Sequence, residues 1–453
     1  MSLFSIYYIE AIKYIVILLS VLGLYYIFKR PKYAFYILLF TLPLKNFYIY
    51  IVTSMEVWKF LSLFFIMLYL YSWLMNISRK NDKFLAILLL LLAYVILTTV
   101  VNYFLIPEGA YNIITGGFFK AEGRPITQII YFCILLSLIL IPYYFLKEAD
   151  VKTVLRTVLY SAILVSILGV VQFLIVQLTG INIFPIHAID GTSHSGYLLQ
   201  SIFRVNSIIG EPKHLAMFMV VAISILLFSD VNNVRLIKYK KISLFLFAFN
   251  LVFAFSTTGY ALIMIVLLFY LYISNIRLIL FLAPLMLIIS FFLINFNESF
   301  IMQGVSAQTA RIGLEIQDKS VLTYLKEEPL HAIIGTGLGN IHHYSSQYIP
   351  TGYPIFKDFP YKANSGLLFM MADYGLIGVF IFYYFVWSLL FKTYNLVYRL
   401  KGAKQFNERR AVVQLTFLMS IIFLFKYTEF LYIMLGITLL INQQLRVILN
   451  DKS

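Results

Sequence analysis

The sequence predicts an all-α, polytopic integral membrane protein of about 12–13 transmembrane helices with two long external loops. The first observation is composition, because 61% of the 453 residues are hydrophobic and only 12% are charged. That is about half the charged share of an average soluble domain. The second is length, because the apolar residues form runs of about 20, which is what a helix needs to cross a bilayer. One helical domain, residues 1–453, accounts for the whole chain.

The apolar runs give about 13 candidate spans, and short or polar-interrupted runs leave the number between about 11 and 14. They are residues 8–28, 33–51, 57–77, 84–106, 126–146, 154–177, 214–230, 242–256, 259–275, 277–296, 366–391, 411–427 and 429–445. The polar sequence that remains gathers in two stretches, residues 180–213 and 297–365. Unpaired backbone groups cannot face lipid, so both stretches must lie outside the hydrocarbon core.

The basic residues between the spans predict the orientation. More than half of them fall in one set of connections, near residues 29–32, 79–83, 147–156, 235–241, 277, 392–410 and 446–452. By the positive-inside rule this set is cytoplasmic, so the N-terminus and both long loops are external and the C-terminus is cytoplasmic. Basic residues in the external loops run against that rule, which favours an anionic ligand there.

Composition also bounds the function classes. The net charge of +15 fits orientation and contact with anionic membrane lipids, so no nucleic-acid partner is expected. The single cysteine, Cys133, excludes an intramolecular disulfide. His342 and His343 are adjacent, and no histidine or carboxylate spacing suits an ion, so no metal and no cofactor are expected. No G-x-S-x-G hydrolase pattern is present, and no cleavable signal peptide is expected.

The first stretch with chemical potential is RVNSIIGEPKHLA, Arg204 to Ala216. Pro212 suits the first turn of a helix, and Gly210 permits an unusual backbone angle before it. A helix N-terminus with Arg204 and Lys213 beside it would cradle a phosphate or diphosphate. Glu211 and His214 are the nearby candidates for a general base; alternatively, Glu211 complements the helix dipole and His214 is an interfacial anchor.

The second stretch is FSTTGY, Phe255 to Tyr260, between two apolar runs. The separation is short, so residues 256–259 are expected to form a tight external turn. Its hydroxyls, including that of Thr258, could contact a ligand head group. Small polar residues are also common at helical hairpins.

The second long loop combines a predicted amphipathic helix, Arg311 to Leu325, with the glycines of IIGTGLGN. No strand–helix–strand unit surrounds these glycines, so they are not a dinucleotide fingerprint. They are expected to let the chain turn tightly against the membrane-embedded body. Arg311 is either an anion ligand or a solvated surface cation.

The fourth stretch, YKANSGLLFMMADYGLIG, joins the second loop to the next span. Lys362 and Asn364 lie where a ligand at the outer leaflet would meet the protein. Asp373 follows about two turns into an apolar helix, where a lone carboxylate is costly and needs a partner. Lys426 and Glu429 are the candidates for that partner.

In their order and spacing, these stretches resemble the membrane polymerases and ligases of bacterial surface polysaccharides. RVNSIIGEPKHLA resembles the family's arginine-then-G-x-P block, and FSTTGY its short Ser/Thr/Arg-Gly turn. RIGLEI through EEPLHAIIGTGLGN resembles its arginine-initiated helix ending in G-x-G-x-G-N. ANSGLLFMMADYGLIG resembles its last block, "HNsyL…e-x-G-x-x-G". The resemblance runs over residues 204–378.

The resemblance implies a metal-independent glycosyltransferase of O-antigen or other surface polysaccharide biosynthesis. It implies an active site on the outer face of the bacterial cytoplasmic (inner) membrane and a substrate carried on undecaprenyl diphosphate. Arg204 and Arg311 would hold the diphosphate, and Lys213 would add its charge at the helix N-terminus. Gly210, Thr258, Lys362 and Asn364 would contact the rest of the substrate. A chain-length regulator and a flippase of the same pathway are the protein partners implied.

The chain departs from the family at Ala363, where a histidine often precedes the asparagine. The general base is therefore open among four residues: Glu211, His214, His342 and His343. The G-E-P of the first block and the missing His-Asn pair favour an O-antigen polymerase over an O-antigen ligase. A flippase for the same lipid-linked units is the alternative of a different class, although transporters tend to have short external loops and functional charges near the midplane.

Overall fold

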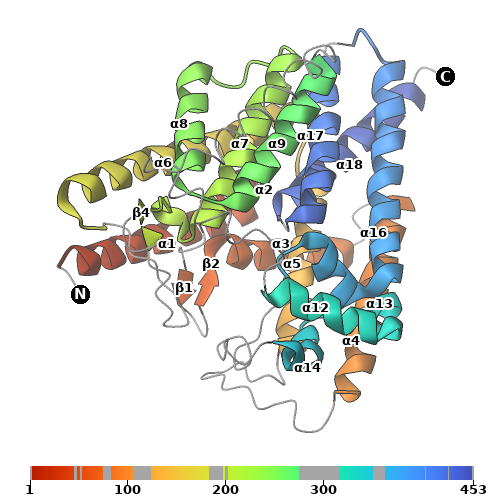
Figure 1. Ribbon diagram of the computed structural model, residues 1–453. Coiled ribbons are helices and arrows are strands. Elements are labelled where there is room, and N and C mark those ends of the chain that lie inside the picture. Colours follow the sequence, from red (N-terminus) through yellow and green to blue (C-terminus); the bar gives the residue numbers. More distant parts are fainter. Residues whose placement is uncertain are drawn as a thin grey trace. The chain divides into compact units, whose positions relative to one another are not determined.

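The protein is described here by a computed structural model. It covers residues 3–44, 48–50, 54–74, 83–106, 124–182, 197–198, 202–274, 316–349, 363–403, 405–426 and 428–450. Within these residues the chain is helical apart from two short antiparallel hairpins (Figure 1). Seven of the described helices are long and apolar enough to cross a membrane: Lys83–Phe104, Arg124–Phe145, Glu148–Thr179, Pro212–Val231, Thr257–Ser274, Gly366–Arg399 and Phe430–Asn450. The expectation of a polytopic helical membrane protein is confirmed.

The chain divides into two compact units, each assembled from segments that are distant in sequence. Unit 1 comprises Met1–Phe64, Phe145–Ile312 and Ala403–Leu418. Unit 2 comprises Phe65–Tyr144, Gly313–Gly402 and Met419–Ser453. The predicted single domain stays a prediction, because this division does not report how the units fold.

Unit 1 is built around one buried helix, α7. Its elements are α1 (Leu3–Lys29), α2 (Pro31–Thr41), β1 (Tyr48–Tyr50), β2 (Ser54–Glu56), η2 (Glu148–Asp150), α6 (Val151–Thr179), β3 (Tyr197–Leu198), β4 (Ile202–Phe203), η3 (Ser207–Ile209), α7 (Pro212–Val231), α8 (Lys240–Phe253) and α9 (Thr257–Ser274). Helix α7 packs against α6, α8 and α9 (Figure 1). Almost every residue of α7 after its first turn is buried, as expected for a helix that is apolar all round.

Unit 2 is built around α16. Its elements are α4 (Lys83–Phe104), α5 (Arg124–Phe145), α12 (Ile316–Glu327), α13 (Pro329–Ile334), α14 (Ile341–Ser345), η4 (Ser346–Tyr348), α16 (Gly366–Arg399) and α18 (Phe430–Asn450), while α3 (Val57–Leu74) and α17 (Phe406–Phe425) run from one unit into the other. Helix α16 packs against α4, α13 and α18. Its backbone breaks at Gly375, which has φ 65° and ψ 177°.

The helix bounds correct two of the predicted spans. The span at residues 33–51 is wrong: α2 ends at Thr41, and β1 occupies Tyr48–Tyr50. Pro43, two residues after Thr41, has no N–H to donate to the helix, which explains this end. The run at 242–256 forms α8, which has only 14 residues and is too short to count among the spanning helices. The predicted span at 277–296 lies outside the described residues.

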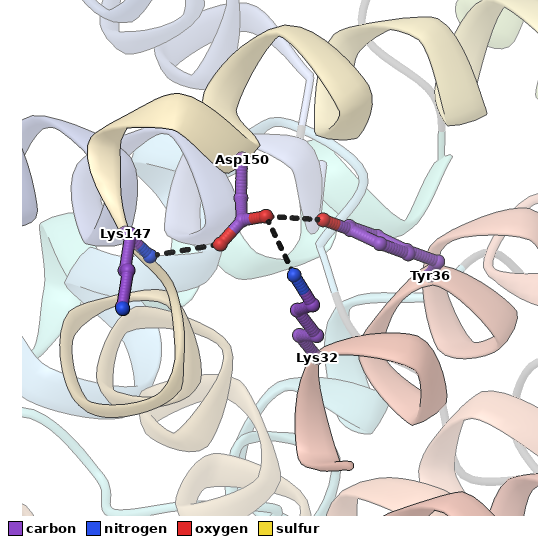
Figure 2. A network of polar contacts seen from close by, with 4 residues as sticks. All are labelled: Lys32, Tyr36, Lys147 and Asp150. Atoms are coloured by element: carbon purple, nitrogen blue, oxygen red, sulfur yellow. Dashed lines mark hydrogen bonds and ion pairs between the residues drawn. The ribbon is translucent and has the colours of Figure 1, made fainter.

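A polar network in unit 1 fixes the start of α6 against α2 (Figure 2). Oδ1 of Asp150 accepts hydrogen bonds from Lys32 Nζ at 3.3 Å and from Tyr36 Oη at 3.2 Å. Its other oxygen accepts one from the backbone N–H of Lys147 at 3.0 Å. Next to it, Glu148 forms a two-pronged ion pair with Arg409 of α17. Asp150 and Glu148 are largely withdrawn from water, so each needs the opposite charge that Lys32 or Arg409 supplies.

Candidate functional site

In unit 1, the segment before α7 pairs with the turn between α8 and α9. The Nε of Arg204 donates a hydrogen bond to the carbonyl of Ala254 at 3.2 Å, and the guanidinium interacts electrostatically with Tyr260. The backbone N–H of Val205 donates to the carbonyl of Phe253 at 2.9 Å. The RVNSIIGEPKHLA and FSTTGY stretches, which the sequence identified separately, therefore form one place in the structure.

A buried glutamine of α6 holds this segment in position. Gln172 accepts through its side-chain oxygen from the backbone N–H of Asn206 at 3.2 Å and of Ser207 at 2.8 Å. The side chain of Asn206 in turn donates to the carbonyl of Gly210 at 3.0 Å. Sequence reasoning missed Gln172, because a single amide within an apolar span does not reveal its partner.

The turn into α7 has the predicted form. Gly210 has φ +102°, a conformation that favours glycine, and Pro212 is the first residue of the helix. The Glu211 carboxylate lies 3.4 Å from Lys213 Nζ and 3.7 Å from His214 Nδ1. All three side chains are about one third exposed. Glu211 therefore lies beside a lysine and a histidine at the N-terminus of α7. We call Arg204, Gly210, Glu211, Lys213 and His214 the arginine site.

The tight turn lies earlier in the chain than the predicted residues 256–259. The chain reverses at Ala254–Ser256, where Phe255 has φ +45°, and α9 begins at Thr257. The Ser256 hydroxyl accepts from the backbone N–H of Gly259 at 3.2 Å, so it caps the helix and the following residues are drawn into it. Thr258 is half-buried in that first helical turn.

In unit 2, the glycine stretch forms a loop, Gly335–Asn340, that packs against α4 and α16. Its three glycines all have positive φ, between +77° and +82°. A Cβ on Gly337 would lie 2.4 Å from the Cα of Thr99. The N–H of Leu338 donates to the Thr99 hydroxyl at 2.9 Å. The prediction of a tight turn against the apolar body is confirmed.

The loop also joins the break in α16. The N–H groups of Thr336 and Gly337 donate to the carbonyls of Ala372 and Asp373 at 2.8 and 3.1 Å. A Cβ on Gly375 would lie 2.3 Å from the backbone nitrogen of Gly335. Gly335 and Gly375 are therefore both required, because their backbones pack directly against each other. The GTGLGN and ADYGLIG stretches meet here directly.

The two adjacent histidines follow this loop on α14 and are buried, His342 at 2% and His343 at 8% exposure. Burial, the positive charge of Arg124 and the neighbouring His343 lower the pKa of His342 to about 3. His342 is therefore neutral at physiological pH. No group of metal-ligating side chains is present among the residues that the structure describes.

Arg124, the first residue of α5, is the functional candidate that the sequence missed. It interacts electrostatically with Asp373 and with His342. Its side chain lies against Gly339, where an added Cβ would be 3.2 Å from Arg124 Cγ. The predicted partners of Asp373 have other contacts: Lys426 donates to the Asn364 side chain and Glu429 accepts from Tyr131. Arg124 thus lies within electrostatic range of Asp373. We call Arg124, Asp373, His342 and His343 the histidine cluster.

Asn364 is held by three hydrogen bonds. Its backbone N–H donates to Asp318 of α12 at 2.7 Å, and its amide nitrogen donates to Gln317 at 2.7 Å. Its amide oxygen accepts from Lys426 Nζ at 3.2 Å. Asp318 also accepts from the N–H of Ser365 at 3.5 Å, so it holds the segment that leads into α16 from a separate helix. Most of the hydrogen-bonding capacity of Asn364 is thus used within the protein.

Arg311 and Lys362 lie outside the described residues, as do the first residues of the helix predicted from Arg311. The second half of that helix is present as α12, with Val321 and Leu325 buried. The predicted apolar side is confirmed only in part, because Ile316 and Leu322 are half-buried while Asp318 and Ser320 are buried.

The two sites offer different chemistry. The arginine site presents half-exposed cations beside a carboxylate and an imidazole, which suits an anionic ligand and proton transfer near water. The histidine cluster presents a neutral imidazole away from water, which suits hydrogen bonding to a neutral polar group. No protein-family model matches this chain, and no curated protein matches it.

Proposed function

We propose that this protein is a membrane glycosyltransferase that polymerises oligosaccharide repeat units carried on undecaprenyl diphosphate into O-antigen or capsule-type polysaccharide. The observation that carries the proposal is the contact of Arg204 with the α8–α9 turn. Its guanidinium belongs to the same short segment of chain as the Lys213 ammonium and the N-terminus of α7. That combination is the chemistry of diphosphate recognition.

The proposal includes a location and an orientation. The chain crosses the bacterial inner membrane several times, the N-terminus is external and the C-terminus is cytoplasmic. The stretches at residues 180–213 and 297–365 are external loops. The arginine site then faces the side on which lipid-linked units await polymerisation. Support for this orientation comes from the distribution of basic residues.

In the proposed reaction, an acceptor sugar hydroxyl attacks the anomeric carbon of the donor. A new glycosidic C–O bond forms while the C–O bond to the diphosphate breaks. The hydroxyl proton passes to a base, which is Glu211, His214, His342 or His343. The lipid diphosphate leaves with the bonding electrons, and Arg204, Lys213 and Arg311 stabilise its charge. Gly210, Thr258, Lys362 and Asn364 contact the remainder of the substrate.

Reconstitution tests the proposal. The protein is placed in proteoliposomes with a synthetic undecaprenyl-diphosphate glycan, with EDTA and no added metal, and products are resolved as a ladder on a gel. We expect a ladder with the wild type and a loss of at least about 100-fold with Arg204→Ala, because an oxyanion-stabilising donor contributes that much. Arg204→Lys should retain part of the activity, since it keeps the charge but loses the fork of donors.

Arg156→Ala is the matched control. Arg156 also donates from Nε to a backbone carbonyl in unit 1, that of Leu236 at 2.9 Å, but it lies outside the arginine site. It should leave the ladder intact. Equal losses in the Arg156 and Arg204 variants would reduce Arg204 to a structural role.

Two other outcomes replace the proposed function. Transfer of one preformed glycan to a lipid acceptor, without a ladder, makes the protein an O-antigen ligase. Passage of labelled lipid across the bilayer without any glycosidic product makes it a flippase for the same lipid-linked units. The G-E-P sequence at Gly210–Pro212 supports the polymerase over the ligase.

A further inference from the structure

The connection between α7 and α8, together with the first turn of α8, carries four basic residues that the proposed reaction does not use (Figure 1). They are Arg235, Lys238, Lys240 and Lys241. Lys240 Nζ lies 2.5 Å from a carboxylate oxygen of Asp230, so its charge is paired. The other three are exposed, and within the described part of the chain none of them has a carboxylate at ion-pairing distance. We call Arg235, Lys238 and Lys241 the basic patch.

Hydrogen bonds from two neighbouring helices hold the backbone that carries the basic patch. The side chain of Asn232 donates to the side-chain oxygen of Gln414 of α17 at 2.7 Å. Arg156 of α6 donates from Nε to the carbonyl of Leu236 at 2.9 Å. The patch is therefore presented by a fixed connection, and a ligand that binds there does not first have to order the chain.

An apolar stripe on the surface begins directly beside the patch. Tyr239, Ile242 and Phe245 are 60%, 60% and 68% exposed. Phe245 follows Lys241 by four residues within α8, which places these two side chains on the same face of the helix, one turn apart. Several of the described helices are long and apolar enough to cross a membrane, so a stripe of large exposed apolar side chains beside them is expected to face lipid.

Tyr239 marks the end of this stripe, where lipid gives way to water. Tyrosine is enriched at that boundary, because its ring is apolar and its hydroxyl is polar. Lys238 Nζ lies 5.0 Å from the centroid of the Tyr239 ring. A lysine beside such a ring keeps its carbon chain against apolar surface and its ammonium in the layer of lipid head groups. Cations without carboxylate partners in that layer attract anionic head groups.

We propose that the basic patch, with Tyr239, binds the head groups of anionic phospholipids and so anchors unit 1 at one surface of the membrane. The apolar stripe that continues from the patch favours a lipid over a soluble anion, because a lipid satisfies both surfaces at once. The patch lies at the start of the 14-residue helix α8, whereas Arg204 contacts the turn at its end. The lipid site is thus separate from the arginine site and does not depend on the proposed reaction.

The test uses Tyr239→Trp as a local reporter in the full-length protein, reconstituted in vesicles of phosphatidylcholine and phosphatidylglycerol. Bromine on the acyl chains of one lipid or the other quenches tryptophan fluorescence at short range, so the two quenching curves give the relative binding constant at this place. The chain has three tryptophans of its own, and their quenching in the wild type is subtracted. Tryptophan also preserves the contact of the aromatic ring with Lys238.

We expect phosphatidylglycerol to be preferred over phosphatidylcholine by about 25-fold, because each of the two lysines near the membrane surface contributes about fivefold. The preference should fall at 1 M salt, where charges are screened beyond about 3 Å. In the same reporter protein, Lys238→Gln with Lys241→Gln should abolish it.

Lys319→Gln with Lys326→Gln is the matched control. Both lysines are exposed and lie on α12, a 12-residue helix of mixed polarity in unit 2, so the same charge is removed away from the apolar stripe. The control pair should leave the lipid preference unchanged. Thermal unfolding checks that each variant is folded. Where the double variant of the patch does not fold, Lys238→Gln and Lys241→Gln are measured singly, and each should retain about a fivefold preference.

Four results overturn the proposal. Equal quenching by the two lipids in the reporter protein shows that no anionic head group is selected. Quenching by neither lipid shows that Tyr239 does not face the membrane. A preference that survives removal of both patch lysines means that other charges hold the lipid. An equal loss in the control pair means that net charge, and not this patch, sets the preference.

Discussion

The turn at Gly210 in unit 1 and the loop of Gly335–Asn340 in unit 2 have the same local design. Each uses positive-φ glycine to lead the chain into a helix that carries histidine. The side chain of His214 is 38% exposed beside Glu211, whereas His342 is 2% exposed beside Arg124. Histidine is therefore solvated at the turn before α7 and buried at the loop before α14.

The difference shows that burial determines the chemistry of each site. At the arginine site, water screens the charges, so each ion pair contributes little to stability and the side chains remain available to a ligand. In the histidine cluster, removing one charge leaves the opposite charge less compensated in a surrounding of low dielectric constant. Variants of the buried region should thus cost stability, while variants of the half-exposed region should cost function.

The largest effect is expected for Gly337→Ala. The new Cβ would lie 2.4 Å from Thr99 Cα at φ +81°, so backbone must move against backbone. We expect a loss of more than about 4 kcal/mol in the free energy of unfolding, the range of severe core disruption. Gly180→Ala is the matched control, because Gly180 has φ +70° but nothing within 4 Å of the added Cβ.

The control should cost only about 1–2 kcal/mol, which is the penalty of a left-handed conformation. Thermal unfolding of both variants in the same detergent measures the difference. Equal losses would mean that backbone conformation, and not the contact with α4, makes Gly337 necessary.

Next is the comparison of two ion pairs within unit 1. Glu148→Ala leaves Arg409, which is 6% exposed at its side chain, as a buried charge without this carboxylate. We expect a loss of about 3–5 kcal/mol. Lys213→Ala, at a pair whose side chains are 38% and 33% exposed, should cost about 0–1 kcal/mol. Chemical unfolding midpoints check both values, and a costly Lys213→Ala would contradict the assignment of the arginine site as solvated.

The third prediction concerns pH. The pKa of His342 is lowered from its ordinary value of 6.5 to about 3, chiefly by burial, so the unfolded chain binds a proton at pH values where the folded protein does not. The stabilising contribution is complete above pH 6.5 and is lost as the pH falls towards 3. Between pH 6.5 and 5 this amounts to about 2 kcal/mol.

His331, whose pKa is also lowered by burial, acts in the same direction, so the comparison must be with His342→Gln. Unfolding free energies of the wild type and this variant, measured at pH 7 and pH 5, isolate the contribution of His342. The wild type should lose more stability on acidification than the variant. An equal loss would show that His342 is solvated in the folded protein.

The smallest expected effect is at Asp318. Asp318→Ala removes the acceptor for the N–H groups of Asn364 and Ser365 at the start of α16, so it should cost about 1–2 kcal/mol. Asp318→Asn keeps an acceptor and should cost less. Thermal midpoints of the two variants rank them, and an unchanged midpoint in Asp318→Ala would show that water satisfies these groups equally well.

Several features were predictable because they depend on local sequence. Pro212 marks the start of α7, the apolar runs mark the long helices, and the glycines of Gly335–Asn340 mark a tight turn. The residue 33–51 span failed because hydropathy does not register the break before Pro43. The turn at residues 256–259 was misplaced because a serine can cap the helix that follows it.

The candidate sites were predictable only in part. Glu211 and Lys213 are close in sequence, and their contact at the start of α7 follows from their spacing, whereas the contact of Arg204 with the α8–α9 turn does not. The electrostatic interaction of Arg124 with Asp373 was not predictable, because their elements meet only after α5 and α16 have packed. Gln172 was missed for the same reason.

The sequence by itself determined that this is a helical membrane protein, since about 20 consecutive apolar residues can satisfy their backbone in lipid only as a helix. It also determined where the chain must turn, because glycine and proline restrict the backbone locally. Tertiary structure decided which charges are buried and what faces them. Only packing fixed the low pKa of His342, because that value depends on water excluded by distant segments and on the charge that Arg124 places beside the ring.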